Sequence, residues 1–299
     1  MEHVRWLTDP GVHQPTLLYA FTGWNDAGDA ASAAVRTLVE RWDATPIAEI
    51  DPEPFTDFAT VRPHVRLADG RRTIVWPTVG VWSASSDGHD VVLVLGPEPA
   101  LRWRSFCAQL VGVAERAEAA RSISLGALLA DVPHTRPVRI IGTASDPDLL
   151  DRFDLRRSRY EGPTGIVGVL HDALSTAGLS TASLWAAVPG YAAQVPSPKA
   201  TVALLERACA LLDVTPPVDR LRGPAAEYDA RVAAMIADDE DLIEYVARLE
   251  TMADEDSDED PDGEADRDPA GDAVIATDVD PGELVAEVEQ FLRDRDPNG

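Results

Sequence analysis

The sequence predicts an α/β fold, in the form of a three-layer α/β/α sandwich built on a mainly parallel sheet. Short apolar segments alternate along the chain with amphipathic segments of helical length. This alternation is typical of parallel sheets that carry helices on both faces. Residues 90–95, DVVLVL, are apolar after the first position, as expected of a strand buried on both faces. The 299 residues are 45% hydrophobic, which is enough for the core of such a domain.

Seven expected strands and four expected helices make up this alternation. Pro163 and Pro198 each open a helix, because proline favours the first helical turn. Residues 52–70 are rich in proline and polar side chains, so we expect them to be an excursion from the sheet. The expected strands are residues 16–21, 47–51, 73–76, 90–95, 122–132, 138–142 and 184–188, and the expected helices are residues 27–42, 100–120, 163–178 and 198–213.

The chain divides into a folded body and an acidic tail. Residues 1–215 form the α/β core domain. After the helix-breaking segment TPPVDRLRGPA, residues 216–253 form a helical extension, with one long helix over 226–253. Residues 254–280 are mostly acidic and bury too little apolar surface to fold, so we expect a disordered linker. We expect residues 281–295 to form a short amphipathic helix, which at this length needs the body or a partner to be stable.

The net charge of −26 is concentrated towards the end of the chain. Residues 238–299 hold 24 of the 52 acidic residues and 4 of the 26 basic ones. We expect neither nucleic acid nor a membrane surface as a partner, because both bind through clustered Lys and Arg. No segment has the length of an apolar membrane span, and the first ten residues lack the pattern of a secretory signal. We therefore expect a cytoplasmic protein.

Motifs for cofactors, metal ions and nucleophiles are missing or incomplete. The sequence has no phosphate-binding loop, no G-x-G dinucleotide fingerprint and no G-x-S-x-G elbow. The acidic run from Asp258 begins like a calcium loop, but Pro269 stands where the bidentate Glu is required. The six histidines form no H-x-x-x-H or H-E-x-x-H pair. We therefore expect no cofactor, no metal ion and no catalytic residue.

The most concentrated polar cluster, GWNDAGD, directly follows the first buried strand. Ligands of open α/β sheets bind at the carboxyl ends of the strands. Asn25, Asp26 and Asp29 are therefore candidate ligand-binding residues, with Trp24 as the apolar wall of a pocket. The same residues also fit a structural role, since Asn and Asp cap helices and acidic groups favour the helix dipole there. Both interpretations stay open, and the structural one is favoured.

Gly165 and Lys199 complete the candidate ligand-binding set. Gly165 belongs to the loop GPTGIVG, which opens a helix whose first amides could hold an anion. The same glycines also suit close packing of a helix on a sheet. Lys199, the only lysine, lies in the first turn of another helix, where a cation is unfavourable for the helix dipole. This position indicates a compensating contact, such as a carboxylate, and the alternative is a solvent-exposed lysine.

Four separated segments of the chain, taken together and in this order, carry a specific resemblance to a known protein family. They are LLYAFTGWNDAGDAASAA (17–34), LGALLADVPHTRPVRIIG (125–142), GPTGIVGVL (162–170) and SLWAAVPGYAAQVPSPKATVALL (183–205). They resemble the proteasome assembly chaperone 2 family in its actinobacterial form, over roughly residues 3–250. The resemblance implies an α/β/α sandwich similar to phosphorylases and nucleoside phosphorylases. It also implies a homo-oligomer, with a trimer among the expected assemblies, and proteasome subunits as partners.

Three functions are compatible with these observations. We favour a non-catalytic oligomeric scaffold or interaction protein that resembles a proteasome assembly chaperone, because no complete catalytic constellation is visible. The alternative is an enzyme or small-molecule binder that uses a strand-end pocket near Asn25 and Asp26. An ATP-dependent carboxylate–amine ligase is the least favoured, because nucleotide grasping of that type relies on two lysines and the chain has only Lys199.

Overall fold

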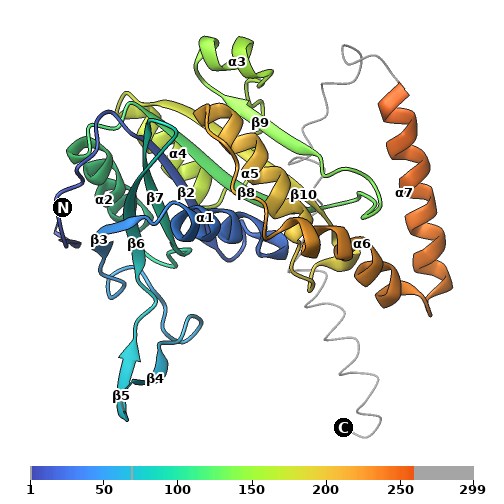
Figure 1. The fold of residues 1–299 in the computed structure, drawn as a ribbon, viewed down its shortest axis with the longest axis horizontal. Helices are drawn as coiled ribbons and strands as arrows, with labels where there is room; N and C mark the ends of the chain where they lie inside the picture. The colour runs from blue at the N-terminus through green and yellow to red at the C-terminus, as the bar shows by residue number, and fades with distance from the viewer. Residues whose placement is uncertain (1, 69, 259–299) are drawn as a thin grey trace, which may run out of the picture.

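A mixed eight-stranded sheet forms the centre of the structure, a computed structural model that describes residues 2–68 and 70–258 (Figure 1). The strand order is β1-β3-β6-β7-β2-β8-β10-β9. The strands of this sheet are β1 (Val4–Trp6), β2 (Thr16–Thr22), β3 (Thr45–Ile50), β6 (Val79–Ser86), β7 (His89–Pro97), β8 (Arg121–Ala130), β9 (Ile140–Ala144) and β10 (Ser180–Pro189). The helices are α1 (Ala30–Arg41), α2 (Trp103–Arg116), α3 (Pro147–Phe153), α4 (Ile166–Thr176), α5 (Pro198–Leu212), α6 (Arg222–Ile236) and α7 (Glu240–Asp258).

The parallel part of the sheet is confined to its four central strands. β7, β2, β8 and β10 run parallel, and the strands on either side are antiparallel to their neighbours. The predicted α/β fold is confirmed, and the sheet is less parallel than expected. An apolar pattern indicates how deeply a strand is buried but not its direction, so the antiparallel flanks could not be predicted from it.

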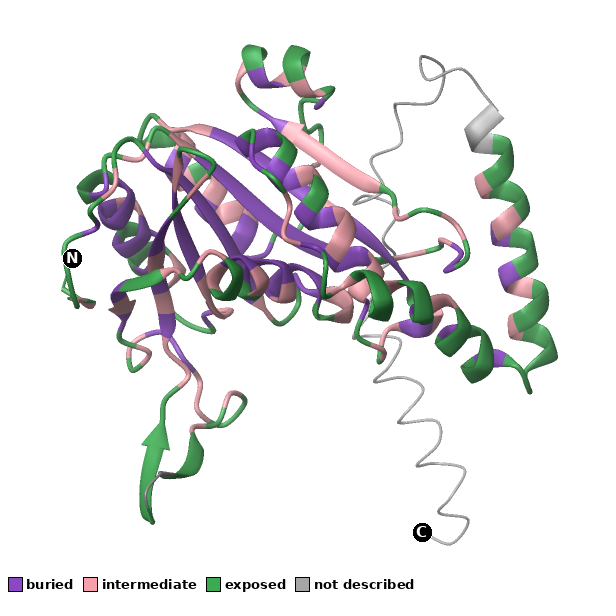
Figure 2. Cartoon of the chain, in the orientation of Figure 1, coloured by how far each residue is buried: buried purple, intermediate pink, exposed green. Residues whose placement is uncertain are grey.

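Helices cover both faces of the sheet, and β2 shows how the layers arise. Leu18 and Ala20 pack in one core with residues of α1 and α5. Leu17, Tyr19 and Phe21 pack in the other core with residues of α2 and α4. Successive side chains of a strand point to opposite faces, so a strand of this kind is buried on both. Figure 2 shows the central strands as the most buried part of the molecule.

β1, β6 and α3 are among the elements of the described chain that were not predicted. β1 is very short, and β6 mixes Gly and Ser with its apolar residues. α3 follows Asp146, whose carboxylate accepts a hydrogen bond from the Asp148 amide as a helix cap does. In each case the local apolar pattern is too short or too interrupted to indicate an element.

The predicted strand over 73–76 lies outside the central sheet. β4 (His64–Ala68) and β5 (Arg71–Val75) pair as a separate antiparallel hairpin. The hairpin projects from the body, at the lower left of Figure 1, and is exposed along its length (Figure 2). The expected excursion at 52–70 therefore contains β4 and leads into this hairpin.

Two helices stand where one long helix was predicted over 226–253. α6 ends at Ile236 and α7 begins at Glu240, because the chain turns between them. α7 continues to Asp258, so the described beginning of the predicted linker 254–280 is helical. The remainder of that linker and the predicted helix 281–295 lie outside the described residues. Across residues 2–68 and 70–258, no helix is long and apolar enough to span a membrane.

Candidate functional site

An open pocket of about 560 Å³ lies at the carboxyl ends of β2 and β7. This volume is within the range of about 300–1,000 Å³ that is typical of small-molecule sites. We call it the strand-end pocket. Its lining is mostly apolar, and Glu98 is its one ionisable residue. The lining residues are Thr22, Gly23, Trp24, Thr60, Val61, Pro97, Glu98, Pro99, Ala100, Trp103, Pro163, Thr164 and Gly165.

Glu98 joins three segments of the chain at this pocket. β2 and β7 run side by side, and the Glu98 amide donates to the Thr22 carbonyl at 2.9 Å. The Glu98 carboxylate accepts hydrogen bonds from Asn25 Nδ2 at 3.0 Å and from the Trp24 amide at 3.3 Å. It also accepts one from the Ile166 amide, in the first turn of α4, at 3.3 Å. Hydrogen bonds to a charged acceptor are the stronger kind, so Glu98 fixes the end of β2 and the start of α4.

Gly165 is required here because Asn25 approaches it closely. A Cβ atom at position 165 would lie 2.4 Å from Asn25 Oδ1, so no larger residue fits without a shift. The amide of Ile166, which was expected to be able to hold an anion, donates to Glu98. The chain's own carboxylate therefore occupies the amino end of α4, where the helix dipole favours negative charge.

Asp26 and Asp29 lie at the start of α1 and do not line the pocket. Asp26 is buried, and its Oδ1 accepts hydrogen bonds from the amides of Ala31 at 2.8 Å and Ser32 at 3.0 Å. Burial raises the pKa of the Asp26 carboxyl, while these hydrogen bonds oppose the rise. Asp29 is exposed at the N-cap position with a φ of 53° and makes no capping bond through its side chain. Asp26 therefore makes hydrogen bonds to the first turn of α1, of the kind that the structural interpretation predicts.

Of the six candidates, the structure brings three together at the pocket. Trp24 and Gly165 line it, and Asn25 lies beneath them in contact with Glu98. Glu98 was missed, because its position beside Trp24 depends on the pairing of β2 with β7. The available signal was its place in GPEP, directly after the buried strand DVVLVL.

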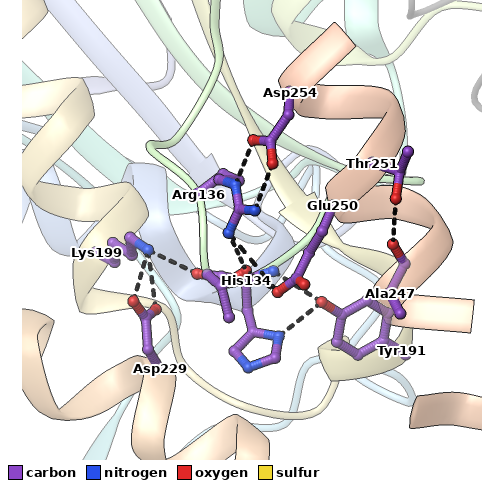
Figure 3. Close-up of polar contacts among 10 residues, drawn as sticks. His134, Arg136, Tyr191, Lys199, Asp229, Ala247, Glu250, Thr251 and Asp254 are labelled. Carbon is purple, nitrogen blue, oxygen red and sulfur yellow. Dashed lines mark hydrogen bonds and ion pairs between the residues drawn. The ribbon is translucent and has the colours of Figure 1, made fainter. Parts of the chain in front are cut away.

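Lys199 belongs to a second polar cluster, at the carboxyl ends of β8 and β10 (Figure 3). Its Nζ donates to both carboxylate oxygens of Asp229 on α6, at 2.9 Å each, and to the carbonyl of His134 at 2.6 Å. The carboxylate contact that the sequence indicated for Lys199 is therefore present. Lys199 is engaged in holding α5, α6 and the loop after β8 together, and it does not line the strand-end pocket.

The buried His134 pairs with the half-buried Tyr191 in the same cluster. The Tyr191 hydroxyl accepts the His134 backbone N–H at 2.8 Å and lies 2.9 Å from His134 Nδ1. The Tyr191 hydroxyl accepts from the His134 backbone N–H, so it can donate its own proton to Nδ1. A ring whose Nδ1 accepts a hydrogen bond is neutral. Burial is the main cause that lowers the pKa of His134, in agreement with a neutral ring, and it raises the pKa of Tyr191 to about 12.

The loop between β8 and β9 attaches α7 to the body. Arg136 donates to the two carboxylate oxygens of Asp254 at 2.6 and 2.7 Å, and it lies 3.8 Å from Glu250 (Figure 3). The Tyr245 hydroxyl donates to Asp131 at 2.7 Å. A bidentate Arg–carboxylate pair also fixes orientation, so these contacts set the position of α7. Two apolar side chains of α7 are also buried, those of Val246 and Leu249.

The strand-end pocket has one ionisable side chain in its lining, that of Glu98. Within residues 2–68 and 70–258, no three His, Cys, Asp or Glu side chains are placed to hold a metal ion. Cys107 and Cys209 are buried thiols without a disulfide.

Comparison with known proteins decides the family. The model of the PAC2 family matches residues 20–236. The chain belongs to the PAC2 family. This PAC2 chain is 46% identical to a PAC2 family protein from Streptomyces avermitilis, with a TM-score of 0.72 over 78% of this chain and 99% of the other. The resemblance expected from the sequence is therefore confirmed. No curated protein matches the chain.

Two further solved structures are similar to this PAC2 chain. The Mycobacterium tuberculosis proteasome-assembly chaperone homologue is 44% identical, with a TM-score of 0.70 over 77% of this chain and 99% of the other. The Pyrococcus furiosus proteasome activator PbaB is 15% identical, with a TM-score of 0.63 over 79% of this chain and 99% of the other. At that identity PbaB shows a shared fold and nothing more.

Proposed function

We propose that this PAC2 protein is a proteasome-assembly-chaperone-like protein, a non-catalytic scaffold that binds proteasome subunits in the cytoplasm. The observation that carries this proposal is the 44% identity to the mycobacterial proteasome-assembly chaperone homologue, which extends over 99% of that protein. At this identity and coverage the two chains share the fold over nearly the whole length of the mycobacterial protein.

The geometry supports a scaffold. Lys199 and Arg136 hold helices in place, and Glu98 holds a loop against α4. The polar side chains of these sites are thus engaged within the chain, whereas several large apolar side chains are exposed, among them Leu67, Ile74 and Trp76. Apolar patches on the surface of a folded protein commonly mark protein-binding sites. We further propose that the protein is a homo-oligomer, with a trimer as the expected assembly.

Affinity capture from the native cytosol tests the proposal. We would compare the tagged full chain with a variant that ends at Asp258, which keeps all of α7 and its contact with Arg136. Stoichiometric proteasome α-subunits in the eluate of the full chain are the expected result. Loss of these subunits from the shorter variant would assign the contact to residues 259–299. A homo-oligomer that captures no proteasome subunit in either sample would overturn the proposal.

The strand-end pocket favours a second candidate function, the binding of a small cation. Its only charged group is the Glu98 carboxylate, and Trp24 and Trp103 supply aromatic walls, a combination that suits an amine or guanidinium group. Saturable quenching of tryptophan fluorescence by agmatine, lost in Glu98→Gln, is the expected result. Equal quenching by pentanamide, a neutral compound of similar size, would contradict it. The unfolding midpoint of Glu98→Gln controls for a disturbed loop.

A further inference from the structure

The hairpin of β4 and β5 presents an uncovered apolar face. Val65 pairs with Ile74, and Leu67 pairs with Arg72. Directly opposed residues of two strands share a face, so Val65, Leu67 and Ile74 lie on one side of the hairpin. Leu67 is 75% exposed and Ile74 is 52% exposed. Trp76, which follows β5, is 48% exposed. We call this set the hairpin face.

This face needs a surface to cover it. A two-stranded hairpin alone is marginally stable in water, and a third strand or a packed helix is needed for independent stability. Every residue of β5 is exposed, and Figure 2 shows the hairpin standing clear of the helices and the central sheet. Trp76 makes an edge-on contact with the ring of Phe58, with 5.1 Å between the centroids. The side chains of Val65, Leu67 and Ile74 remain 49%, 75% and 52% exposed.

The charge of the hairpin indicates what covers it. Residues 61–76 contain four arginines and one acidic residue, in a chain with a net charge of −26. None of these arginines forms an ion pair with a described residue. Opposite charges across an interface steer association and exclude wrong partners. The surface that covers the hairpin face should therefore be acidic. A second copy of this chain is an acidic molecule and fits this requirement. The four arginines are Arg62, Arg66, Arg71 and Arg72.

A matching surface lies at the corner between α6 and α7. Met235 and Ile243 are exposed there, beside carboxylates that form no ion pair with a described residue. The corner and the hairpin stand at opposite ends of the molecule (Figure 1), so the hairpin cannot reach the corner of its own chain. We call this set the acidic corner, and it consists of Met235, Asp238, Glu240, Asp241 and Ile243.

We propose that the hairpin face of one copy docks on the acidic corner of a second copy. The inference rests on the self-association proposed above and names its interface. Two basic hairpins repel each other, so a symmetric hairpin-to-hairpin contact is disfavoured. The contact joins different surfaces of two identical chains, and such a head-to-tail contact generates a closed ring when the rotation between copies closes.

Charge reversal with rescue tests the interface, with the mass in solution measured by light scattering. The hairpin variant Arg71→Glu/Arg72→Glu and the corner variant Glu240→Lys/Asp241→Lys should each raise the Kd of self-association at least tenfold. The chain that carries all four substitutions should regain the assembly, because its charges are complementary again. Arg36→Glu/Arg41→Glu, which reverses two exposed arginines of α1, should keep the mass of the unmodified chain. Circular dichroism checks that each variant is folded.

The outcomes separate this inference from the proposed function. A full chain that is monomeric would overturn both the self-association and the interface. An oligomeric full chain whose hairpin variant or corner variant keeps its mass would overturn the interface alone. Failure of the fourfold variant to regain the assembly would also overturn it. Capture of proteasome subunits is a separate measurement, and its result does not change any of these conclusions about self-association or the interface.

Discussion

Asn25 shows how one side chain can define a loop. Its Nδ2 donates to Glu98, while its Oδ1 is buried without a hydrogen-bond partner among the described residues. An unsatisfied buried acceptor is costly, on the order of 1–3 kcal/mol. The contact of Oδ1 with Gly165 leaves no room for a side chain at that position. Asn25, Glu98 and Gly165 therefore act as one unit in which each residue restricts the other two.

Gly165→Ala should destabilise the protein by roughly 1–3 kcal/mol, the usual cost of overpacking. The added Cβ would lie 2.4 Å from Asn25 Oδ1, so the loop at Trp24 must move. The free energy of unfolding in urea measures this change. Gly223→Ala is the matched control, because no atom lies within 4 Å of its Cβ position in α6. An equal effect of the two substitutions would contradict the assigned role of Gly165.

His134 and His171 make the stability depend on pH. Burial lowers the pKa of both His134 and His171 in the folded protein. The unfolded chain protonates these rings below about pH 6.5, whereas the folded chain keeps them neutral. The unfolded state then binds more protons, so the free energy of unfolding falls as the pH falls below that value. The raised pKa of Asp26 acts in the opposite sense, so single variants are needed to isolate each group.

His134→Asn should reduce the loss of stability between about pH 7.5 and about pH 5.5. Its side-chain oxygen can replace Nδ1 as the acceptor for Tyr191 and does not titrate in this range. Chemical denaturation of the full chain at both pH values measures the effect. His13→Asn, at an exposed position, should leave the pH dependence unchanged. The assignment fails if both variants keep the pH dependence of the unmodified chain.

At the scale of elements, α7 is held mainly by one loop. Its contacts reach residues 131–136 between β8 and β9, and its apolar contacts are few, with Val246 and Leu249 buried. Elements with few buried apolar contacts open locally before the whole protein unfolds. α7 should therefore be the first helix of the described chain to exchange its amide hydrogens.

Arg136→Gln should speed hydrogen exchange in α7 at least several-fold while leaving α5 unchanged. The substitution removes the bidentate contact with Asp254 and so weakens the attachment of α7 to the loop after β8, where the contact of Tyr245 with Asp131 remains. Hydrogen exchange read by mass spectrometry on peptides of both helices measures this difference. Arg248→Gln is the control, because the contacts it removes, with Glu244 and with the ring of Tyr245, both lie inside α7. Equal exchange in the two variants would show that Arg136 does not hold the helix.

At the scale of the whole molecule, the hairpin and the acidic corner carry charges of opposite sign. The hairpin is basic, whereas the chain as a whole has a net charge of −26. Charges separated by more than the Debye length are screened, and this length is about 10 Å at 0.1 M salt and about 3 Å at 1 M. An assembly held by contacts between hairpin and acidic corner therefore combines an apolar centre with a salt-sensitive rim.

Raising the NaCl concentration from about 0.05 M to about 0.5 M should weaken self-association of the full chain. Sedimentation velocity at several protein concentrations gives the Kd at each salt concentration. The chain with all four reversed charges should show the same salt dependence. Self-association that strengthens with salt would indicate an interface dominated by apolar contacts and would contradict a charged rim.

The sequence by itself determined the elements whose pattern is local. The apolar run before GWNDAGD predicts a buried strand, and Pro163 and Pro198 mark the start of helices, because strand burial and helix capping depend on neighbouring residues. The same local pattern predicted Trp24, Asn25, Asp26 and Asp29 near a strand end, and Gly165 at the start of a helix. It also indicated a carboxylate partner for Lys199.

Only the tertiary structure decided which of these residues meet. Glu98 reaches Asn25 because β7 pairs with β2, and Asp229 reaches Lys199 because α6 packs on α5. The direction of the outer strands, the exposed hairpin and the turn between α6 and α7 depend in the same way on long-range pairing. Contacts between residues far apart in the chain are selected by the packing of the whole fold, and no local spacing records them.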